Sequence, residues 1–351
     1  MFLCGHGRGP ILARNRMPAV LEILRRQRGP SNDRSADADD IGRASDAPLS
    51  IGLALSGGAA RGFAHIGVIR TLLANGIRPD VIAGTSIGAI VGGVYAAGQI
   101  EDFEAWTRTL NRRRVFGYLD FSLAGSGLIG GDRLFNQLDE SLADRRIEDL
   151  PVRMAAVATE LRTSHEIWLT RGRLADAVRA SSALPGIFPP SRIGGRWLMD
   201  GALVNPLPIS AARALGARLV IAINVNADNF GRGTIIQDHG SDAEDELRRQ
   251  AAKAPRGLRG AAERLVSRKF FGTPDRPGLS TVMIDAFQVL QDRVTRARLA
   301  GDPPDVLISP RLNRVGLFDF HRAAEIIALG AEATEKALPS IAEAVETLTQ
   351  A

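Results

Sequence analysis

Gly84-Thr85-Ser86-Ile87-Gly88 stands between a short apolar run at 80–83 and a longer apolar stretch at 86–97. The first run predicts a buried strand and the second a buried helix. A serine on such a tight strand-to-helix turn exposes its hydroxyl group, and the glycines two positions before and after it allow the backbone to bend sharply. We therefore predict a nucleophile elbow with Ser86 as the nucleophile and both glycines as supporting residues.

Short apolar runs alternate with longer helical patterns on both sides of this turn. The alternation is typical of strands joined by crossover helices, so we predict a three-layer α/β/α fold with a mostly parallel central sheet. Strands are predicted at 51–55, 81–83, 152–159, 166–170, 196–199, 219–225 and 306–308, and helices at 61–75, 86–97, 102–111, 132–142, 174–181, 208–215, 279–299 and 320–347.

Two segments depart from this pattern. Residues 1–48 are rich in Arg, Asp, Gly, Pro and Ser and have too little apolar area to offset the entropy of ordering, so we expect a weakly ordered tail. Residues 49–350 are expected to form one domain. A polar, glycine-rich and then basic stretch at about 226–278 is expected to be an irregular excursion from that domain.

The bulk composition narrows the function classes. The net charge of +5 comes almost entirely from arginine, but zinc-ligand spacing is absent and only 5% of residues are aromatic, so we predict no nucleic-acid partner. The single cysteine, Cys4, excludes an internal disulfide. No run of 18 apolar residues and no signal-peptide pattern are present, and we expect a cytoplasmic protein.

A second glycine turn, at 55–62, links the first strand to the first helix. Successive glycines allow backbone N–H groups to point into one concavity, where a developing oxyanion would be stabilised. An ordinary tight turn is the alternative. A dinucleotide site is a further one, but the glycines lack the G-x-G-x-x-G spacing and Asp80 precedes its strand. A phosphate-binding P-loop would need a Lys-Ser/Thr pair that is missing.

Asp200-Gly201 follows the predicted strand at 196–199. Asp-Gly is a common turn dipeptide, yet beside the first two motifs the carboxylate becomes a candidate base. Residues 180–190 contain three prolines, which suit a rigid wall between two catalytic loops. A Ser-His-Asp arrangement in α/β-hydrolase order would require His239 or His321, whereas His65 is predicted to be a packing residue.

Four of these blocks, in this order, resemble the patatin-like phospholipase family: 56–62, 84–88, 180–188 and 200–202. The resemblance implies a lipid acyl hydrolase in which Ser86 and Asp200 form a catalytic dyad, with an acyl-enzyme intermediate and neither cofactor nor metal. It also implies an oxyanion hole and supporting residues. The hole is assigned to Gly57, Gly58 and Ala59, and the supporting residues are Arg61, Gly62, Gly84, Gly88, Pro185 and Gly201. The family usually has a third glycine where this chain has Ser56, whose side chain could narrow access.

Two other functions remain open from the sequence. The first is a catalytically weak lipid-binding or regulatory protein that retains the pocket, and the second is a dinucleotide-binding protein. The segment 248–271 combines basic and apolar residues, so peripheral contact with an anionic membrane at its inner face is one interpretation and a solvated loop is the other.

Overall fold

The computed structural model describes residues 49–118, 131–227, 272–273 and 276–350. The predicted tail at 1–48 and the basic segment at 248–271 lie outside the described residues. The chain divides into two compact units, one of Met1–Asn229 with Leu290–Ala351 and one of Phe230–Val289. All residues of the site described below belong to the first unit.

The described strands of the first unit form one eight-stranded sheet. They are β1 (Ile51–Leu55), β2 (Val81–Thr85), β3 (Arg153–Glu160), β4 (Glu166–Leu169), β5 (Ser191–Ile193), β6 (Arg196–Asp200), β7 (Leu219–Ile223) and β10 (Val306–Ile308). The strand order is β10-β7-β1-β2-β3-β6-β5, with β4 also paired to β3. The pairs from β10 to β3 are parallel, whereas β4 and β6 are antiparallel to β3 and β5 is antiparallel to β6. The predicted mostly parallel sheet is confirmed.

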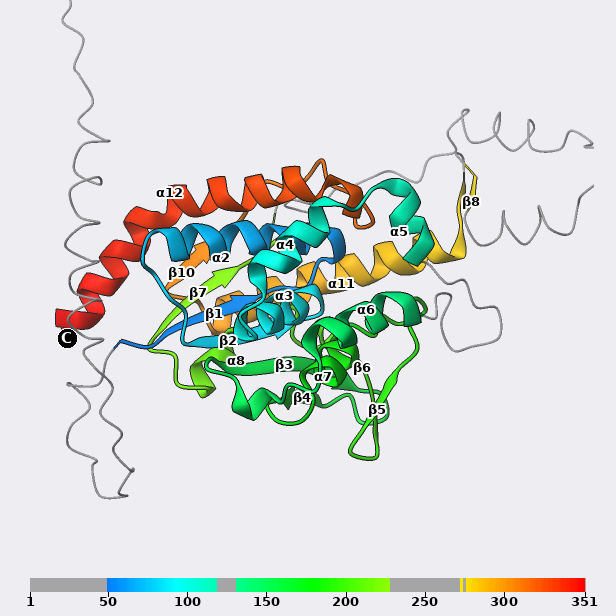
Figure 1. The fold of residues 1–351 in the computed structure, drawn as a ribbon, viewed down its shortest axis with the longest axis horizontal. Coiled ribbons are helices and arrows are strands. Elements are labelled where there is room, and N and C mark those ends of the chain that lie inside the picture. The colour runs from blue at the N-terminus through cyan, green and yellow to red at the C-terminus, as the bar shows by residue number, and fades with distance from the viewer. Residues whose placement is uncertain (1–48, 119–130, 228–271, 274–275, 351) are drawn as a thin grey trace, which may run out of the picture. The chain divides into compact units, whose positions relative to one another are not determined.

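Helices cover both faces of this sheet (Figure 1). One face carries α2 (Ala64–Ala74), α3 (Ile87–Ala96), α4 (Ile100–Arg108), α7 (Leu174–Ser181) and α12 (Ala323–Gln350), and the other carries α8 (Ile209–Ala214). β1 shows why: Ile51, Leu53 and Leu55 join the large cluster under the first group, whereas the small Ala54 packs toward α8. Because successive side chains of a strand point to opposite faces, one strand serves both layers, which confirms the three-layer fold.

The remaining elements are short or lie partly in the second unit. They are α5 (Arg112–Tyr118), α6 (Asp132–Leu142), α11 (Leu279–Gly301), the hairpin of β8 (Gly272–Thr273) and β9 (Arg276–Pro277), and the 3₁₀ helices η1 (Ala59–Phe63), η2 (Ile147–Asp149), η3 (Gly201–Leu203) and η4 (Phe320–Arg322). The sequence pattern missed α5 and the edge strand β5. None of the described helices is both long and apolar enough to cross a membrane.

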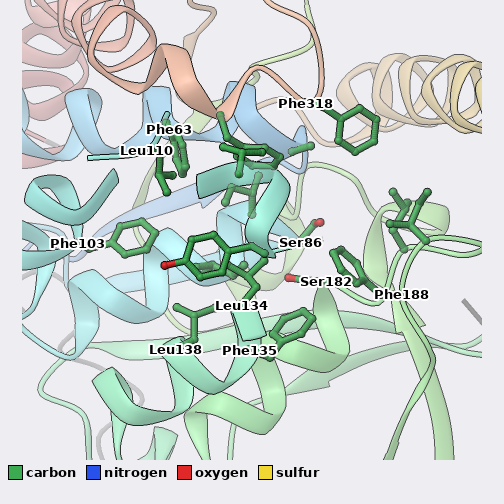
Figure 2. A pocket seen from close by; sticks show the side chains of 18 of the residues that line it. Phe63, Ser86, Phe103, Leu110, Leu134, Phe135, Leu138, Ser182, Phe188 and Phe318 are labelled. Carbon is green, nitrogen blue, oxygen red and sulfur yellow. The ribbon is translucent and has the colours of Figure 1, made fainter. Parts of the chain in front are cut away.

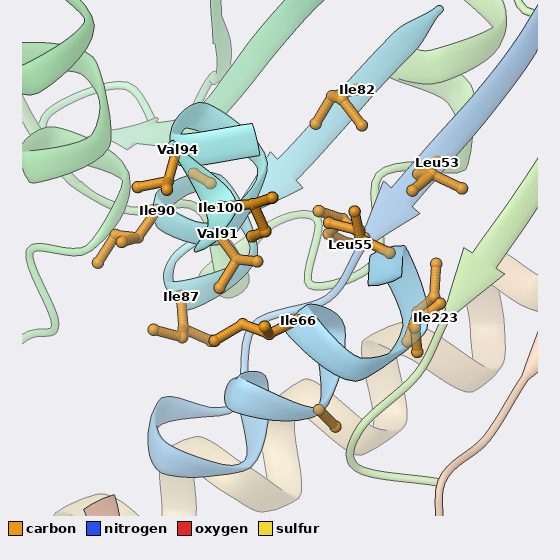
Figure 3. Close-up of a cluster of buried hydrophobic side chains, with 14 of the residues drawn as sticks. Leu53, Leu55, Ile66, Ile82, Ile87, Ile90, Val91, Val94, Ile100 and Ile223 are labelled. Carbon is orange, nitrogen blue, oxygen red and sulfur yellow. The ribbon is translucent and has the colours of Figure 1, made fainter. Parts of the chain in front are cut away.

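The turn around Ser86 is anchored by the apolar core. Buried side chains of α3, among them Ile87, Ile90 and Val91, pack against Ile66 of α2 and Leu55 of β1 (Figure 3). Such close packing leaves little freedom to shift the first turn of α3. The core therefore fixes the position from which Ser86 projects.

Helices α2 and α12 approach closely at two glycines. A Cβ atom at Gly67 would overlap the carbonyl oxygen of Ile327, and one at Gly330 would overlap that of Ala64. We expect Gly67→Ala to lower the free energy of unfolding by about 1–3 kcal/mol because the helices must separate. Urea denaturation measures the change. Gly117→Ala is the matched control, since a Cβ there meets no atom within 4 Å, and an equal loss in both variants would contradict the packing argument.

Candidate active site

Ser86 occupies the turn between β2 and α3 in a strained backbone conformation. Its φ of 56° and ψ of −125° are unusual for a residue with a side chain. A Cβ atom at Gly84 would lie 2.5 Å from the carbonyl oxygen of Gly88, and one at Gly88 would overlap the carbonyl oxygen of Leu55. Both glycines are therefore required for the close approach of β2, α3 and β1 that forces Ser86 outward.

Asp200 ends β6 and is almost fully buried, with 1% of its surface exposed. Its carboxylate accepts a hydrogen bond from the Ala202 N–H at 2.8 Å, and the nearby Ser86 hydroxyl group lowers the pKa of this carboxyl group. Its own backbone is fixed as well, because its N–H donates to Ala183 O at 2.9 Å and its carbonyl accepts from Thr159 Oγ1 at 2.9 Å. The fold thus brings the side chains of Ser86 and Asp200 near one another.

Burial raises the pKa of the Asp200 carboxyl group from its usual 3.8 to about 6, and the hydrogen bonds from Ser86 and Ala202 oppose the rise only in part. A carboxylate with a raised pKa is a stronger base, because loss of solvation destabilises the charged form. At neutral pH the group is ionised and able to accept a proton from the serine hydroxyl group.

The glycine turn after β1 lies beside Ser86, since a Cβ atom at Gly57 would be 3.5 Å from that of Ser86. The N–H of Gly57 donates to Pro206 O at 3.1 Å, so this amide has an acceptor within the protein. The N–H groups of Gly58 and Ala59 have no acceptor among the described residues. Their φ angles of 157° and 48° turn the chain sharply at this point.

Ser56 does not narrow the site. Its hydroxyl oxygen accepts a hydrogen bond from the Val225 N–H at 3.1 Å, and its N–H donates to Ile223 O at 3.2 Å. Both groups are thus directed to the end of β7, and the residue does not line the cavity described below. The serine that replaces the family's usual glycine is accommodated by these hydrogen bonds to the neighbouring strand.

Arg61 holds a distant loop against the glycine turn. Its side chain is 7% exposed, Nε donates to Val315 O at 2.8 Å and the guanidinium reaches Asn226 Oδ1 at 3.3 Å. Burial lowers the pKa of this guanidinium, and the negative charge of Asp319 counteracts the effect. Arg61 therefore has a supporting position and does not line the cavity.

The other predicted supporting residues sit at close contacts. Gly62 packs on Ile87 and Gly201 packs on the Val157 carbonyl group, in each case where a Cβ atom would overlap the neighbour. Pro185 lies between Leu184 and Ile187, which both line the cavity.

No histidine lines this cavity within the described ranges. His65 is fully buried in α2, where Nε2 donates to Ser56 O at 2.9 Å and Nδ1 has no partner among the described residues. Burial lowers the pKa of His65 to about 4. His321 lies next to Arg112, with 3.4 Å between His321 Nε2 and Arg112 Nε, and His239 falls outside the described residues. A Ser-His-Asp triad at Ser86 finds no support.

An apolar cavity of about 140 Å³ has Ser86 in its wall (Figure 2). Aromatic and aliphatic side chains dominate its wall, and the only hydroxyl-bearing residues are Ser86, Ser182 and Tyr118. The wall consists of Ala59, Phe63, Ser86, Ile87, Ile90, Phe103, Trp106, Leu110, Val115, Tyr118, Leu134, Phe135, Leu138, Ser182, Leu184, Ile187, Phe188, Phe318 and Phe320. Such a lining suits a hydrocarbon chain.

Ser181 has a role that sequence reasoning missed. Its hydroxyl oxygen accepts a hydrogen bond from the Ser86 N–H at 2.9 Å and donates to Val157 O at 2.5 Å. The hydroxyl group therefore ties the strained turn to β3. Ser181 was visible in the sequence as part of the block at 180–188, but nothing in the pattern indicated its partner.

In the described ranges no three His, Cys, Asp or Glu side chains are grouped so that they could hold a metal ion.

Comparison with known proteins places this geometry in context. The model of the patatin-like phospholipase family matches residues 53–213. An uncharacterized NTE family protein of Mycobacterium tuberculosis is 33% identical over 337 residues, covering 84% of this chain and 93% of that protein. A lysophospholipase, NTE1, of Yarrowia lipolytica is 34% identical and covers 55% of this chain but only 14% of its own length. The crystal structure of VipD from Legionella pneumophila matches with a TM-score of 0.45 and 16% identity, over 83% of this chain and 67% of that one.

Proposed function

The chain belongs to the patatin-like phospholipase family and is a serine-type lipid ester hydrolase, and from this premise we propose that Ser86 and Asp200 are its catalytic dyad. The observation that carries the proposal is the proximity of the Ser86 hydroxyl group, at the wall of an apolar cavity, to the buried Asp200 carboxylate. A nucleophile beside a desolvated base is the arrangement that covalent ester hydrolysis needs.

In acylation, Ser86 Oγ attacks the ester carbonyl carbon while its proton passes to Asp200. The negative charge that develops on the carbonyl oxygen is stabilised by the N–H groups of Gly58 and Ala59, which are free to donate. The tetrahedral intermediate then collapses, the carbon–alkoxy bond breaks, and Asp200 returns the proton to the departing alcohol. In deacylation water replaces the alcohol, Asp200 takes its proton, and the carboxylic acid leaves as Ser86 recovers its hydrogen.

We propose phospholipids or lysophospholipids as the substrates. The described residues of the cavity wall are mostly apolar, and this lining supports recognition through the acyl chain. The lysophospholipase from Yarrowia lipolytica among the relatives agrees with this class. Membrane contact through residues 248–271 stays a prediction from the sequence.

Hydrolysis in ¹⁸O-labelled water tests the proposed reaction. The protein is incubated with phosphatidylcholine and lysophosphatidylcholine in mixed micelles, and released fatty acids are analysed by mass spectrometry. We expect fatty acid carrying one ¹⁸O atom, since water attacks the acyl-enzyme carbonyl carbon. No release above the rate without protein would point to a lipid-binding protein instead.

The pH dependence of kcat/KM should report the ionisation of Asp200. Only the carboxylate accepts the serine proton, and burial raises its pKa to about 6. We therefore expect kcat/KM to be level above pH 7 and to fall about tenfold per pH unit below pH 6. Initial rates on a soluble ester from pH 4.5 to 9 provide the profile, with the fold monitored by circular dichroism. A profile that stays level down to pH 4.5 would contradict the raised pKa.

A further inference from the structure

Ser182 carries a buried hydroxyl group that the mechanism above does not use. It follows the last residue of α7, is 6% exposed and lines the same cavity as Ser86 (Figure 2). Its backbone N–H bonds to Val178 O at 3.1 Å, but its Oγ has no hydrogen-bond partner among the described residues. Buried hydroxyl groups are nearly always paired, so an unpaired one in a ligand cavity indicates a partner that arrives with the ligand.

The residue before Ser182 contacts the elbow that carries the nucleophile. The hydroxyl group of Ser181 is 2.9 Å from the backbone nitrogen of Ser86, so Ser182 is one residue away from a side chain that touches the elbow. Since Ser182 and Ser86 line the same cavity, an ester bound at Ser86 shares that cavity with the Ser182 hydroxyl group.

The chemistry of the cavity limits what this hydroxyl group can bind. Hydrocarbon fills an apolar cavity without offering an acceptor, so the polar atoms of a bound acyl ester near Ser86 are its two ester oxygens. The carbonyl oxygen is taken by the N–H groups of Gly58 and Ala59 in the mechanism above. The alkoxy oxygen, which becomes the leaving group, is left without a donor.

We propose that the Ser182 hydroxyl group donates a hydrogen bond to the alkoxy oxygen of the bound ester and so positions the leaving group. The inference rests on the proposed function. Ser182 keeps its own proton throughout: the carbon–alkoxy bond breaks, charge gathers on the oxygen, and the proton that completes the alcohol comes from Asp200. The hydrogen bond from Ser182 therefore strengthens as the carbon–alkoxy bond breaks. This effect favours the hydrolysis of oxygen esters over that of thioesters.

A matched oxyester and thioester of dodecanoic acid test this assignment, because a thioester presents sulfur, a weak acceptor, at the leaving position. We expect Ser182→Ala to lower kcat/KM for the oxyester about 3- to 10-fold, the effect of one neutral hydrogen bond. For the thioester we expect a change of less than about twofold. Ser182→Thr, which keeps the hydroxyl group, should retain the wild-type ratio of the two rates.

Ser181→Ala is the matched control. It removes a hydroxyl group one position away that holds the Ser86 backbone, so it should slow both substrates by the same factor. Thermal melting of Ser182→Ala should match or exceed that of the wild type, since the variant removes an unpaired buried polar group. Equal losses on both esters in Ser182→Ala, or loss of the wild-type ratio in Ser182→Thr, would overturn the assignment. Failure of the wild-type protein to cleave either ester would instead refute the proposed function.

Discussion

Replacing Ser86 by alanine is expected to lower kcat/KM for a long-chain ester by about 10⁴-fold or more, because no acyl-enzyme forms without the hydroxyl group. The residue is only partly buried and its backbone is held by the Ser181 hydroxyl group, so alanine fits the same turn. Hydrolysis rates and a thermal melt of the variant together measure the effect. The fold should be retained.

The matched comparison for Ser86→Ala is Ser182→Ala, which removes a hydroxyl group from the same cavity. A loss of several orders of magnitude is expected only for Ser86→Ala. Residual activity within about 100-fold of the wild type in a purified, folded Ser86→Ala variant would show that another group performs the attack.

Replacing Asp200 by asparagine should lower turnover by about 10³- to 10⁴-fold, because the amide accepts no proton from Ser86. Asparagine has nearly the same shape, and its side-chain oxygen still accepts the Ala202 N–H. The rate on a soluble ester is the measurement, and His321→Ala is the control because His321 does not line the cavity. Retained activity in Asp200→Asn with loss in His321→Ala would contradict the dyad.

Asp200→Asn should also raise the free energy of unfolding, although it lowers the rate. The pKa of Asp200 is higher in the folded protein, about 6, than its usual 3.8, so the folded state holds this proton more tightly. The contribution of this bound proton to the free energy of unfolding is complete below pH 3.8, and it is lost as the pH rises through 6. Above that pH the buried charge costs up to about 3 kcal/mol, which asparagine avoids.

Denaturant unfolding of the wild type and Asp200→Asn at pH 4 and pH 8 measures this difference. We expect the variant to have a higher free energy of unfolding than the wild type at pH 8, and we expect this difference to disappear toward pH 4. A variant that is less stable at pH 8 would indicate that the carboxylate contributes to folding, and would count against a desolvated base at this position.

The elements of the fold that the sequence predicted well depend on local patterns. β1 is a short apolar run followed by a longer helical pattern, and that pattern correctly indicated a strand in a sheet between helical layers. The edge strand β5, with three residues, and the short helix α5 have too few residues for a period to emerge. Their structure depends on neighbours, β6 in the case of β5, that are not visible in a local window.

The site likewise combines features that the local sequence predicts with features that depend on distant residues. The turn at Ser86 was predictable because it is encoded by glycines two positions away, whereas the pairing of Ser86 with Asp200 was implied only by the resemblance to the family. The acceptor of the Gly57 N–H was not predictable, since it is the carbonyl group of Pro206, which is distant in the sequence. The cavity likewise combines side chains from separate elements, such as Phe103 and Phe318. Only the folded chain shows which N–H groups already have an acceptor and which side chains line the cavity.

Labelling with a fluorophosphonate bearing a long alkyl chain tests the central claim, that Asp200 activates Ser86, most directly. We predict one adduct, located on Ser86 by peptide mass spectrometry, with a rate that falls below pH 6 in parallel with kcat/KM. In Asp200→Asn the labelling rate should drop by at least about 100-fold. An adduct on a different residue, or equal labelling rates in the two proteins, would contradict the account.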